Sequence, residues 1–145
     1  MAGAARIAAV DEATVRAADG AAPCLQADER AVARRIRNAA LVMIRVHPWW
    51  LDLPVIGTTL AGLAVAAARS GRPAEAARCW GTAMRFGTRQ DFAVLAHARL
   101  RPLLVDAVGE GPVADAETAS AGWDRAEAVA QARMLLEELR YAFRM

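Results

Sequence analysis

Alanine is the feature that most restricts what this chain can fold into, because 37 of its 145 residues are alanine. Alanine has the highest intrinsic helix propensity, whereas Ile, Val and Thr are too thinly spread to form the strands of a sheet. Apolar residues make up 56% of the chain, which is enough for a buried core in one domain of this length. The sequence therefore predicts an all-α domain.

Helix boundaries are predicted from apolar spacing, capping residues and the positions of Gly and Pro. Asp28 is a suitable N-cap, and the helix that it starts ends before Pro48, since a residue preceding proline disfavours helical torsions. Gly71 closes one helix and Pro73 opens the next, while Pro102 is expected to kink or split another. The predicted helices span residues 5–18, 28–46, 55–70, 73–86, 91–108, 113–121 and 125–143. The expected apolar face of the second helix comprises Val32, Ile36, Ala39, Ala40 and Met43.

One predicted hairpin, over residues 57–86, has the spacing of a tetratricopeptide repeat. Ala64 and Ala76 would let its two helices approach closely, and Trp80 would fill the groove between this hairpin and the next. Flanking windows match poorly, so the pattern predicts antiparallel helical hairpins stacked as a short tetratricopeptide-like solenoid over 28–145, after an N-terminal helix and loop over 1–27. The repeat positions are Leu60, Leu63, Ala64, Ala67, Gly71, Ala76, Trp80 and Ala83.

Several kinds of catalysis are excluded by the residue types. All eighteen basic residues are arginine, and both a P-loop and Schiff-base chemistry, including that of pyridoxal phosphate, need lysine. Neither serine lies in a G-x-S-x-G motif. An enzyme or small-ligand site using His97 with Asp91 or Asp106 stays a minor alternative, because neither carboxylate lies three or four residues from the histidine. We expect no catalytic residue and no cofactor.

A metal site is also disfavoured, because tetrahedral zinc sites usually contain at least one close pair of ligands. The four side chains that would be needed here are widely separated in the sequence, namely Cys24, Cys79, His47 and His97. Two isolated cysteines are typical of a reducing compartment. The longest uncharged run, 53–68, is shorter than the roughly 20 residues of a membrane-spanning helix. The sequence thus predicts a cytoplasmic protein that binds no metal and has no membrane contact.

Charge is segregated along the chain: residues 1–29 carry a net charge of −3, residues 30–105 of +9, and residues 106–145 of −4. Either the acidic ends fold against the basic middle, or the middle presents a basic surface to nucleic acid. We favour the first arrangement, because aromatic residues are not interleaved with the arginines as stacking platforms would be. Direct nucleic-acid binding through the arginine-rich 30–101 segment is therefore kept as an alternative function.

Four short segments carry a resemblance to a known family: LDLPV at 51–55, GRPAEAARCWG at 71–81, RFGTRQD at 85–91 and GWDRAEAV at 122–129. In order and spacing they resemble the C-terminal helical-repeat region of actinobacterial transcriptional regulators of the Streptomyces antibiotic regulatory protein type, which carry a bacterial transcriptional activator domain. The resemblance covers roughly residues 30–140. It implies a scaffold for regulatory contacts without catalytic residues. This chain departs from those regulators in having neither a winged-helix domain nor a P-loop module, and in having Trp80 where leucine is usual.

The expected function is a non-catalytic helical-repeat module that mediates regulatory protein–protein contacts linked to transcription; the partner and the oligomeric state are open. The expected binding surface combines an arginine stripe on one helix with the groove lined by the first helix of each pair. Trp49 and Trp50 follow the helix that carries the arginine stripe. They either anchor a partner or plug a seam between helices, and we favour the seam. The candidate partner-binding residues are Arg34, Arg37, Arg45, Trp49, Trp50, Thr58, Val65 and Arg69.

Overall fold

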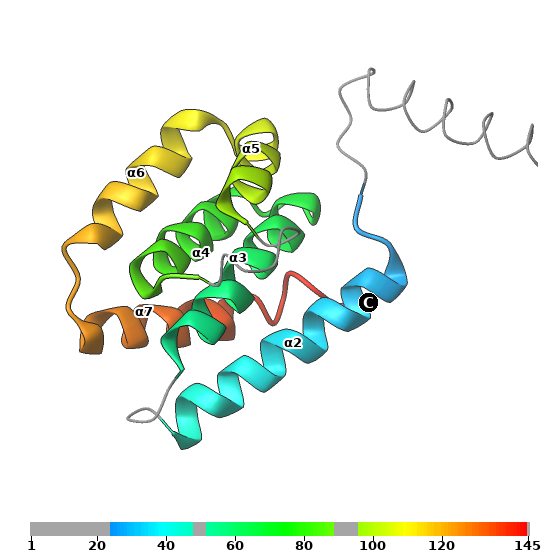
Figure 1. Cartoon of the computed structure of the whole chain (residues 1–145). Coiled ribbons are helices and arrows are strands. Elements are labelled where there is room, and N and C mark those ends of the chain that lie inside the picture. The colour runs from blue at the N-terminus through cyan, green and yellow to red at the C-terminus, as the bar shows by residue number, and fades with distance from the viewer. Residues whose placement is uncertain (1–23, 48–51, 89–95, 145) are drawn as a thin grey trace, which may run out of the picture.

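A computed structural model describes residues 24–47, 52–88 and 96–144. Within these ranges the chain forms six α-helices and no strand, so the all-α prediction is confirmed (Figure 1). The predicted helix at 5–18, Trp49, Trp50 and Asp91 lie outside the described residues. The helices are α2 (Ala27–Val46), α3 (Leu53–Arg69), α4 (Pro73–Phe86), α5 (His97–Val108), α6 (Glu110–Ala121) and α7 (Arg125–Glu138).

The turn between α3 and α4 is set by local sequence. Gly71 has a φ of +73°, a conformation that glycine adopts without the steric cost of a side chain. Its N–H donates to the carbonyl of Ala68, and the N–H of Arg72 donates to that of Ala67, both at 3.0 Å. These two bonds are those of a Schellman motif. Pro73 then occupies the first turn of α4, where no intrahelical N–H is needed.

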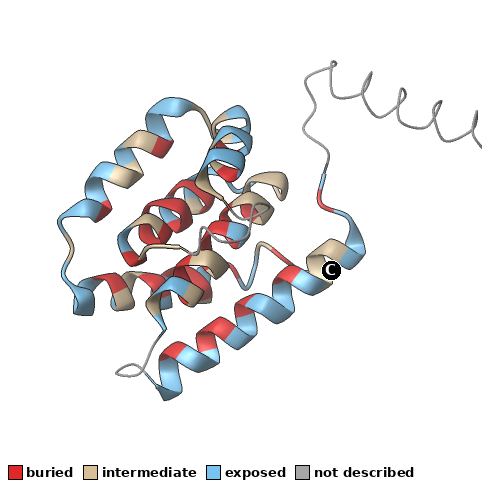
Figure 2. Ribbon diagram, viewed as in Figure 1, coloured by how far each residue is buried: buried red, intermediate tan, exposed pale blue. Residues whose placement is uncertain are grey.

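The α3–α4 hairpin forms the centre of the domain. The two helices pack along each other, α6 and α7 cover further sides of α4, and α5 lies against both α3 and α4 (Figure 1). Buried residues gather on α3 and α4 accordingly (Figure 2). Trp80 of α4 is fully buried, and its ring meets the His97 ring of α5 edge-on, with centroids 5.5 Å apart. Trp80 therefore fills the space between the α3–α4 hairpin and the next helices.

Two glycines permit the closest approaches in this core. A Cβ placed on Gly81 of α4 would lie 2.4 Å from the carbonyl oxygen of Ala116 on α6. A Cβ on Gly57 of α3 would lie 1.8 Å from the carbonyl oxygen of Gly87, which follows α4. Both distances are far below van der Waals contact, so these helices cross at separations that only glycine allows.

The remaining helices close the domain at one side. After α6, the chain turns so that α7 packs against α4 and α2. The α2 helix lies at the edge of the bundle, where it contacts α7 along one face and α3 along another (Figure 1). Among the described helices, α7 and α3 make the main contacts with α2, and a large part of the surface of α2 is left open.

Some predicted boundaries were wrong. Asp28 is not the N-cap of α2: the helix begins at Ala27 after Gln26 as N-cap, and the Glu29 carboxylate accepts the N–H of Gln26 at 2.8 Å. The α6 helix begins at Glu110, since proline is tolerated in a first helical turn. The α5 helix is not split at Pro102, and α7 ends at residue 138 rather than 143.

Candidate functional site

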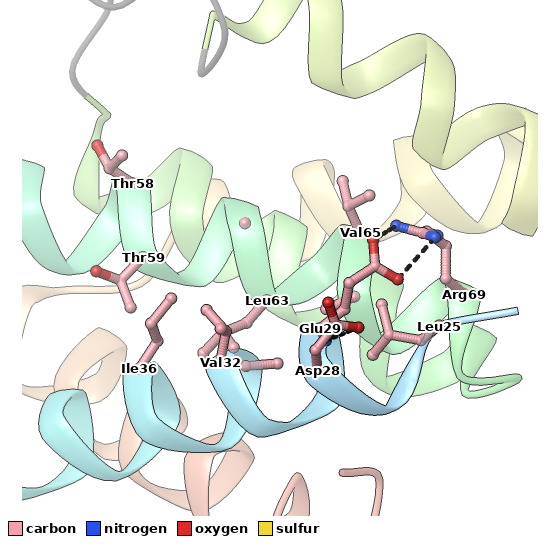
Figure 3. A pocket seen from close by; sticks show the side chains of 13 residues that line it. Leu25, Asp28, Glu29, Val32, Ile36, Thr58, Thr59, Leu63, Val65 and Arg69 are labelled. Atoms are coloured by element: carbon pink, nitrogen blue, oxygen red, sulfur yellow. Dashed lines mark hydrogen bonds and ion pairs between the residues drawn. The ribbon is translucent and has the colours of Figure 1, made fainter. Parts of the chain in front are cut away.

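An open groove of about 600 Å³ runs between α2 and α3 (Figure 3). Val32 and Ile36 line its α2 wall and are 54% and 43% exposed. Thr58, Thr59 and Val65 line its α3 wall. The groove is therefore bounded by apolar and small side chains contributed by two helices that cross at the edge of the domain.

The polar groups on the α3 wall are satisfied within the protein. The Thr58 hydroxyl donates to the carbonyl of Pro54 at 2.7 Å, and the Thr59 hydroxyl donates to that of Val55 at 2.9 Å. Along α3 no charged residue occurs before Arg69. This wall therefore leaves few polar groups that a bound molecule would have to hydrogen-bond, as is usual for grooves that bind an apolar face.

A charged pair closes one end of the groove. The Arg69 guanidinium forms two hydrogen bonds with the Glu29 carboxylate, at 3.0 and 3.1 Å (Figure 3). The pKa of Glu29 is lowered, first by the N–H of Gln26 and then by Arg69. Since α3 and α2 supply one partner each, the pair joins the two walls and closes the groove at this end.

Of the apolar face predicted for α2, only Ala40 is buried in the core. Val32, Ile36 and Met43 are exposed, although the sequence predicts them to be buried. The helix carries two adjacent stripes with the same spacing, offset by one residue, and apolar periodicity cannot tell which of them faces the core. The buried stripe contains small residues that let α2 lie close to α7 and α3, and consists of Ala33, Arg37, Ala40, Leu41 and Ile44.

Arg37 is buried, which corrects the prediction that it stands on an exposed arginine stripe. Its Nε–H donates to the carbonyl of Leu136, in the last turn of α7, where backbone carbonyls lack helical partners. A second nitrogen of Arg37 donates to the side-chain oxygen of Asn38. Burial is the main cause that lowers the pKa of Arg37, and nearby Arg140 lowers it further. The residue thus holds α2 against α7.

The other predicted partner-binding residues that the structure describes do not lie on one surface. Thr58, Val65 and Arg69 line the groove, whereas Arg45 lies on the opposite side of α2 and pairs with Glu137 of α7 at 2.6 Å. Arg34 is exposed and forms no ion pair with another described residue. The α2 wall of the groove, with Val32 and Ile36, was missed because these residues were assigned to the core, and the spacing of apolar residues along α2 does not distinguish the exposed stripe from the buried one.

Ion pairs join the basic middle of the chain to its acidic ends. This is the first of the two arrangements that the charge segregation allows, and it occupies arginines that would otherwise be available to phosphates. Glu117 accepts hydrogen bonds from both Arg101 and Trp80, and its pKa is lowered chiefly by its hydrogen bond with Arg101. The pairs that cross between the segments are Arg69–Glu29, Arg45–Glu137, Arg78–Glu138, Arg101–Glu110 and Arg101–Glu117.

A second hollow, of about 740 Å³, lies between α2 and the C-terminal residues after α7. Its lining mixes polar and apolar side chains, and several of the polar groups are already engaged in ion pairs or hydrogen bonds. Arg45 pairs with Glu137, and Arg140 donates to the Tyr141 hydroxyl at 2.9 Å. This hollow therefore offers a partner less than the α2–α3 groove does.

The side chains that were candidates for catalysis or metal binding do not lie together. Cys79 is fully buried, and burial raises the pKa of its thiol to about 12, so it is not a reactive thiolate. His97 packs against Trp80 and hydrogen-bonds with Thr88. Burial lowers the pKa of His97, and the charge of Glu117 opposes this effect. Within the described ranges, no three His, Cys, Asp or Glu side chains are grouped so that they could hold a metal ion.

Comparison of the chain with models of known protein families, with curated proteins and with solved structures gave no match. Among the helices that the structure describes, none has both the length and the apolar character needed to cross a membrane.

Proposed function

We propose that this chain is a non-catalytic, tetratricopeptide-like helical module that acts by binding a partner protein through the α2–α3 groove. The observation that carries the proposal is the exposure of Val32 and Ile36 opposite Val65, in a groove with few polar demands. A contiguous exposed apolar surface rimmed by polar residues is typical of a protein-binding site. A groove between helices is suited to the apolar face of another helix.

The packing of the central helices supports the tetratricopeptide-like part of this proposal. Except for Gly71 in the turn, the repeat positions of the α3–α4 hairpin are buried, with Leu60, Ala64, Ala76 and Trp80 at 0% exposure. The α5–α6 pair follows with α5 against α3 and α6 against α4, as a second hairpin of a stack would. The α7 helix departs from such a stack, because it packs against α4 and α2.

The link to transcription rests on the resemblance of the four segments at 51–55, 71–81, 85–91 and 122–129 to a regulatory region that has no catalytic residues. On that basis we place the partner among cytoplasmic regulatory proteins. Direct nucleic-acid binding is the weaker alternative, because Arg69, Arg78 and Arg101 are engaged with carboxylates. A direct binder neutralises several phosphates and loses affinity steeply with salt.

Affinity capture from the cell that makes the protein, followed by mass spectrometry, tests the proposal. We expect a specific partner whose recovery falls at least about tenfold with Val65→Glu, since a buried unpaired charge costs several kcal/mol. Leu103→Glu is the control at an exposed residue outside the groove, and because Val65 packs partly against the core, the circular dichroism of Val65→Glu must match that of the unaltered chain. Equal recovery with both variants, or no specific partner at all, would overturn the proposal.

Fluorescence anisotropy with labelled nucleic acids distinguishes direct nucleic-acid binding from the proposed protein binding. We expect no binding of duplex DNA or single-stranded RNA at physiological salt. Tight binding that weakens steeply with salt, and that is lost on changing Arg34 and Arg35 to Gln, would favour a nucleic-acid function instead.

A further inference from the structure

Arg37 is a buried cation that lacks a counter-ion. It is only 6% exposed, and among the described residues no carboxylate lies within ion-pair distance of its guanidinium. The groups that accept its hydrogen bonds are neutral, namely the carbonyl of Leu136 and the side-chain oxygen of Asn38. Because a buried charge is costly unless an opposite charge compensates it, this guanidinium indicates a place for an anion.

One nitrogen of this guanidinium is open to the second hollow, which lies between α2 and the residues after α7. Arg37 lines that hollow. Its Nη2 donates to no described residue, yet among the described side chains the Ser70 hydroxyl is the only buried polar group without a partner. The Nη2 of Arg37 is therefore accessible, and it places two N–H donors at the wall of the hollow.

Neighbouring polar groups of the hollow also present donors. The side-chain oxygen of Asn38 already accepts from Arg37, so its amide N–H groups are what it can offer a ligand. The Tyr141 hydroxyl accepts from Nη2 of Arg140 at 2.9 Å, which leaves the phenol O–H and two other nitrogens of Arg140 as donors. A molecule whose polar atoms are acceptors fits this arrangement.

The charges of the hollow favour an anion as well. The lining carboxylates, Glu137 and Glu138, are each paired with an arginine, at 2.6 and 2.7 Å. Arg37 and Arg140 have no carboxylate partner among the described residues. Burial lowers the pKa of Arg37, and the charges of Arg140 and Arg45 lower it further, as expected where cations gather without an anion. Two positive charges therefore remain uncompensated beside the hollow.

We propose that the second hollow binds a phosphate monoester, whose phosphate is held by Arg37 and Arg140. At neutral pH such a group carries close to two negative charges and presents three acceptor oxygens, which matches two uncompensated guanidiniums and a set of donors. A carboxylate supplies a single charge, and arginine pairs especially well with phosphate. The inference goes beyond the proposed function, because the hollow and the α2–α3 groove share no lining residue.

The rest of the lining suits the organic part of an ester. Leu41 and Val42 give the hollow an apolar wall, and Val42 is 58% exposed. The volume of about 740 Å³ is in the range of sites that bind small organic molecules and is much larger than a phosphate ion needs. We therefore expect the phosphate to be attached to an organic group.

Isothermal titration calorimetry of the full chain with phenyl phosphate tests the site. We expect a dissociation constant below about 1 mM at physiological salt, and binding of benzoate, which has one charge, at least about tenfold weaker. Arg140→Gln should weaken phenyl phosphate binding at least about tenfold, because a charge-assisted contact is lost. Arg140 is exposed, so this variant should fold as the unaltered chain does. Arg34→Gln is the matched control, since it removes a charge from an exposed position of α2 outside the hollow, and should change binding by less than about twofold.

Three results of the calorimetry would overturn the inference: no saturable binding of phenyl phosphate, equal binding by the unaltered chain and Arg140→Gln, or benzoate binding as tight as that of phenyl phosphate. Nuclear magnetic resonance then checks the location, because Asn38 and Tyr141 are the only asparagine and the only tyrosine of the chain. Phenyl phosphate should shift the side-chain amide signals of Asn38 and the ring signals of Tyr141. Binding that leaves both sets of signals unchanged would place the ligand elsewhere and overturn the assignment to this hollow.

A phosphate monoester can belong to a small molecule or to a phosphorylated side chain of a protein. Titration with a phosphoserine peptide, with the unphosphorylated peptide as control, distinguishes these sources. Binding of the phosphopeptide at least about tenfold tighter than that of phenyl phosphate would assign the phosphate to a protein, and weaker binding would assign it to a small molecule. Since Val65 does not line the hollow, Val65→Glu should bind phenyl phosphate normally, so this site and the groove can fail separately.

Discussion

The indole N–H of Trp80 on α4 donates to the carboxylate of Glu117 on α6 at 2.7 Å, and the same carboxylate accepts from Arg101 of α5 at 2.9 Å. One carboxylate thus joins three helices at the point where a fully buried tryptophan fills the core. A buried indole N–H without an acceptor would destabilise this packing. The domain therefore depends on a polar contact at its most apolar position.

Replacing Trp80 with Phe should lower the free energy of unfolding by about 2–4 kcal/mol, because a charge-assisted hydrogen bond is lost and the smaller ring leaves unfilled space. Urea denaturation followed by circular dichroism measures the change. Trp123→Phe is the control, since Trp123 is only partly buried, and it should cost less than about 1 kcal/mol. Equal losses in the two variants would contradict the importance of the Glu117 contact.

Two glycines inside helices should respond to alanine in opposite directions. Alanine stabilises a helix by about 1 kcal/mol relative to glycine. At Gly62 of α3 an added Cβ meets nothing within 4 Å, so Gly62→Ala should raise the urea midpoint. At Gly81 the Cβ would clash with the Ala116 carbonyl at 2.4 Å, so Gly81→Ala should lower it despite the same gain in propensity. A stabilised Gly81→Ala variant would show that α4 and α6 separate easily.

Arg37→Met should lower the free energy of unfolding by about 1–3 kcal/mol, because the carbonyl of Leu136 loses its donor in a buried place while the methionine keeps most of the packing. Arg34→Met, on the exposed side of the same helix, should change it by no more than about 0.5 kcal/mol. Chemical denaturation of both variants under one set of conditions makes the comparison. A stabilised Arg37→Met variant would mean that the desolvation of the guanidinium outweighs its hydrogen bonds.

The contrast between α2 and the α3–α4 hairpin explains how far the sequence predicts this fold. In the hairpin, turn chemistry at Gly71 and Pro73 agrees with the repeat spacing, and its two helices lie close to the predicted bounds of 55–70 and 73–86. In α2 the helix itself is predicted, but its orientation about its own axis is not. Two apolar stripes of equal spacing were available, and contacts with α7, nearly 100 residues away, select the one that contains Arg37.

For the candidate site, too, residues on α3 were predicted and residues on α2 were not. Thr58, Val65 and Arg69 were predicted to line a groove formed by the first helix of each pair, and in the structure they line a groove between α2 and α3. Val32 and Ile36 were not, since an exposed apolar residue has no mark in the sequence that separates it from a core residue. The pairing of Arg69 with Glu29 also depends on residues 40 positions apart and has no local signal.

His97 should make stability fall as the pH drops below about 6.5. Burial lowers the pKa of the folded histidine, so the unfolded chain takes up a proton at a higher pH than the folded chain does. Stability is therefore complete above the unfolded pKa and declines as the pH falls from there. The carboxylates Glu117 and Glu29, whose pKa values are lowered in the fold, lose their contribution separately, below about pH 4.5. Thermal unfolding at pH 7.5 and 5.5 should show a decrease in melting temperature that is smaller in His97→Gln, because glutamine stays neutral and can still bond to Thr88. An equal decrease in both proteins would place the titrating group elsewhere.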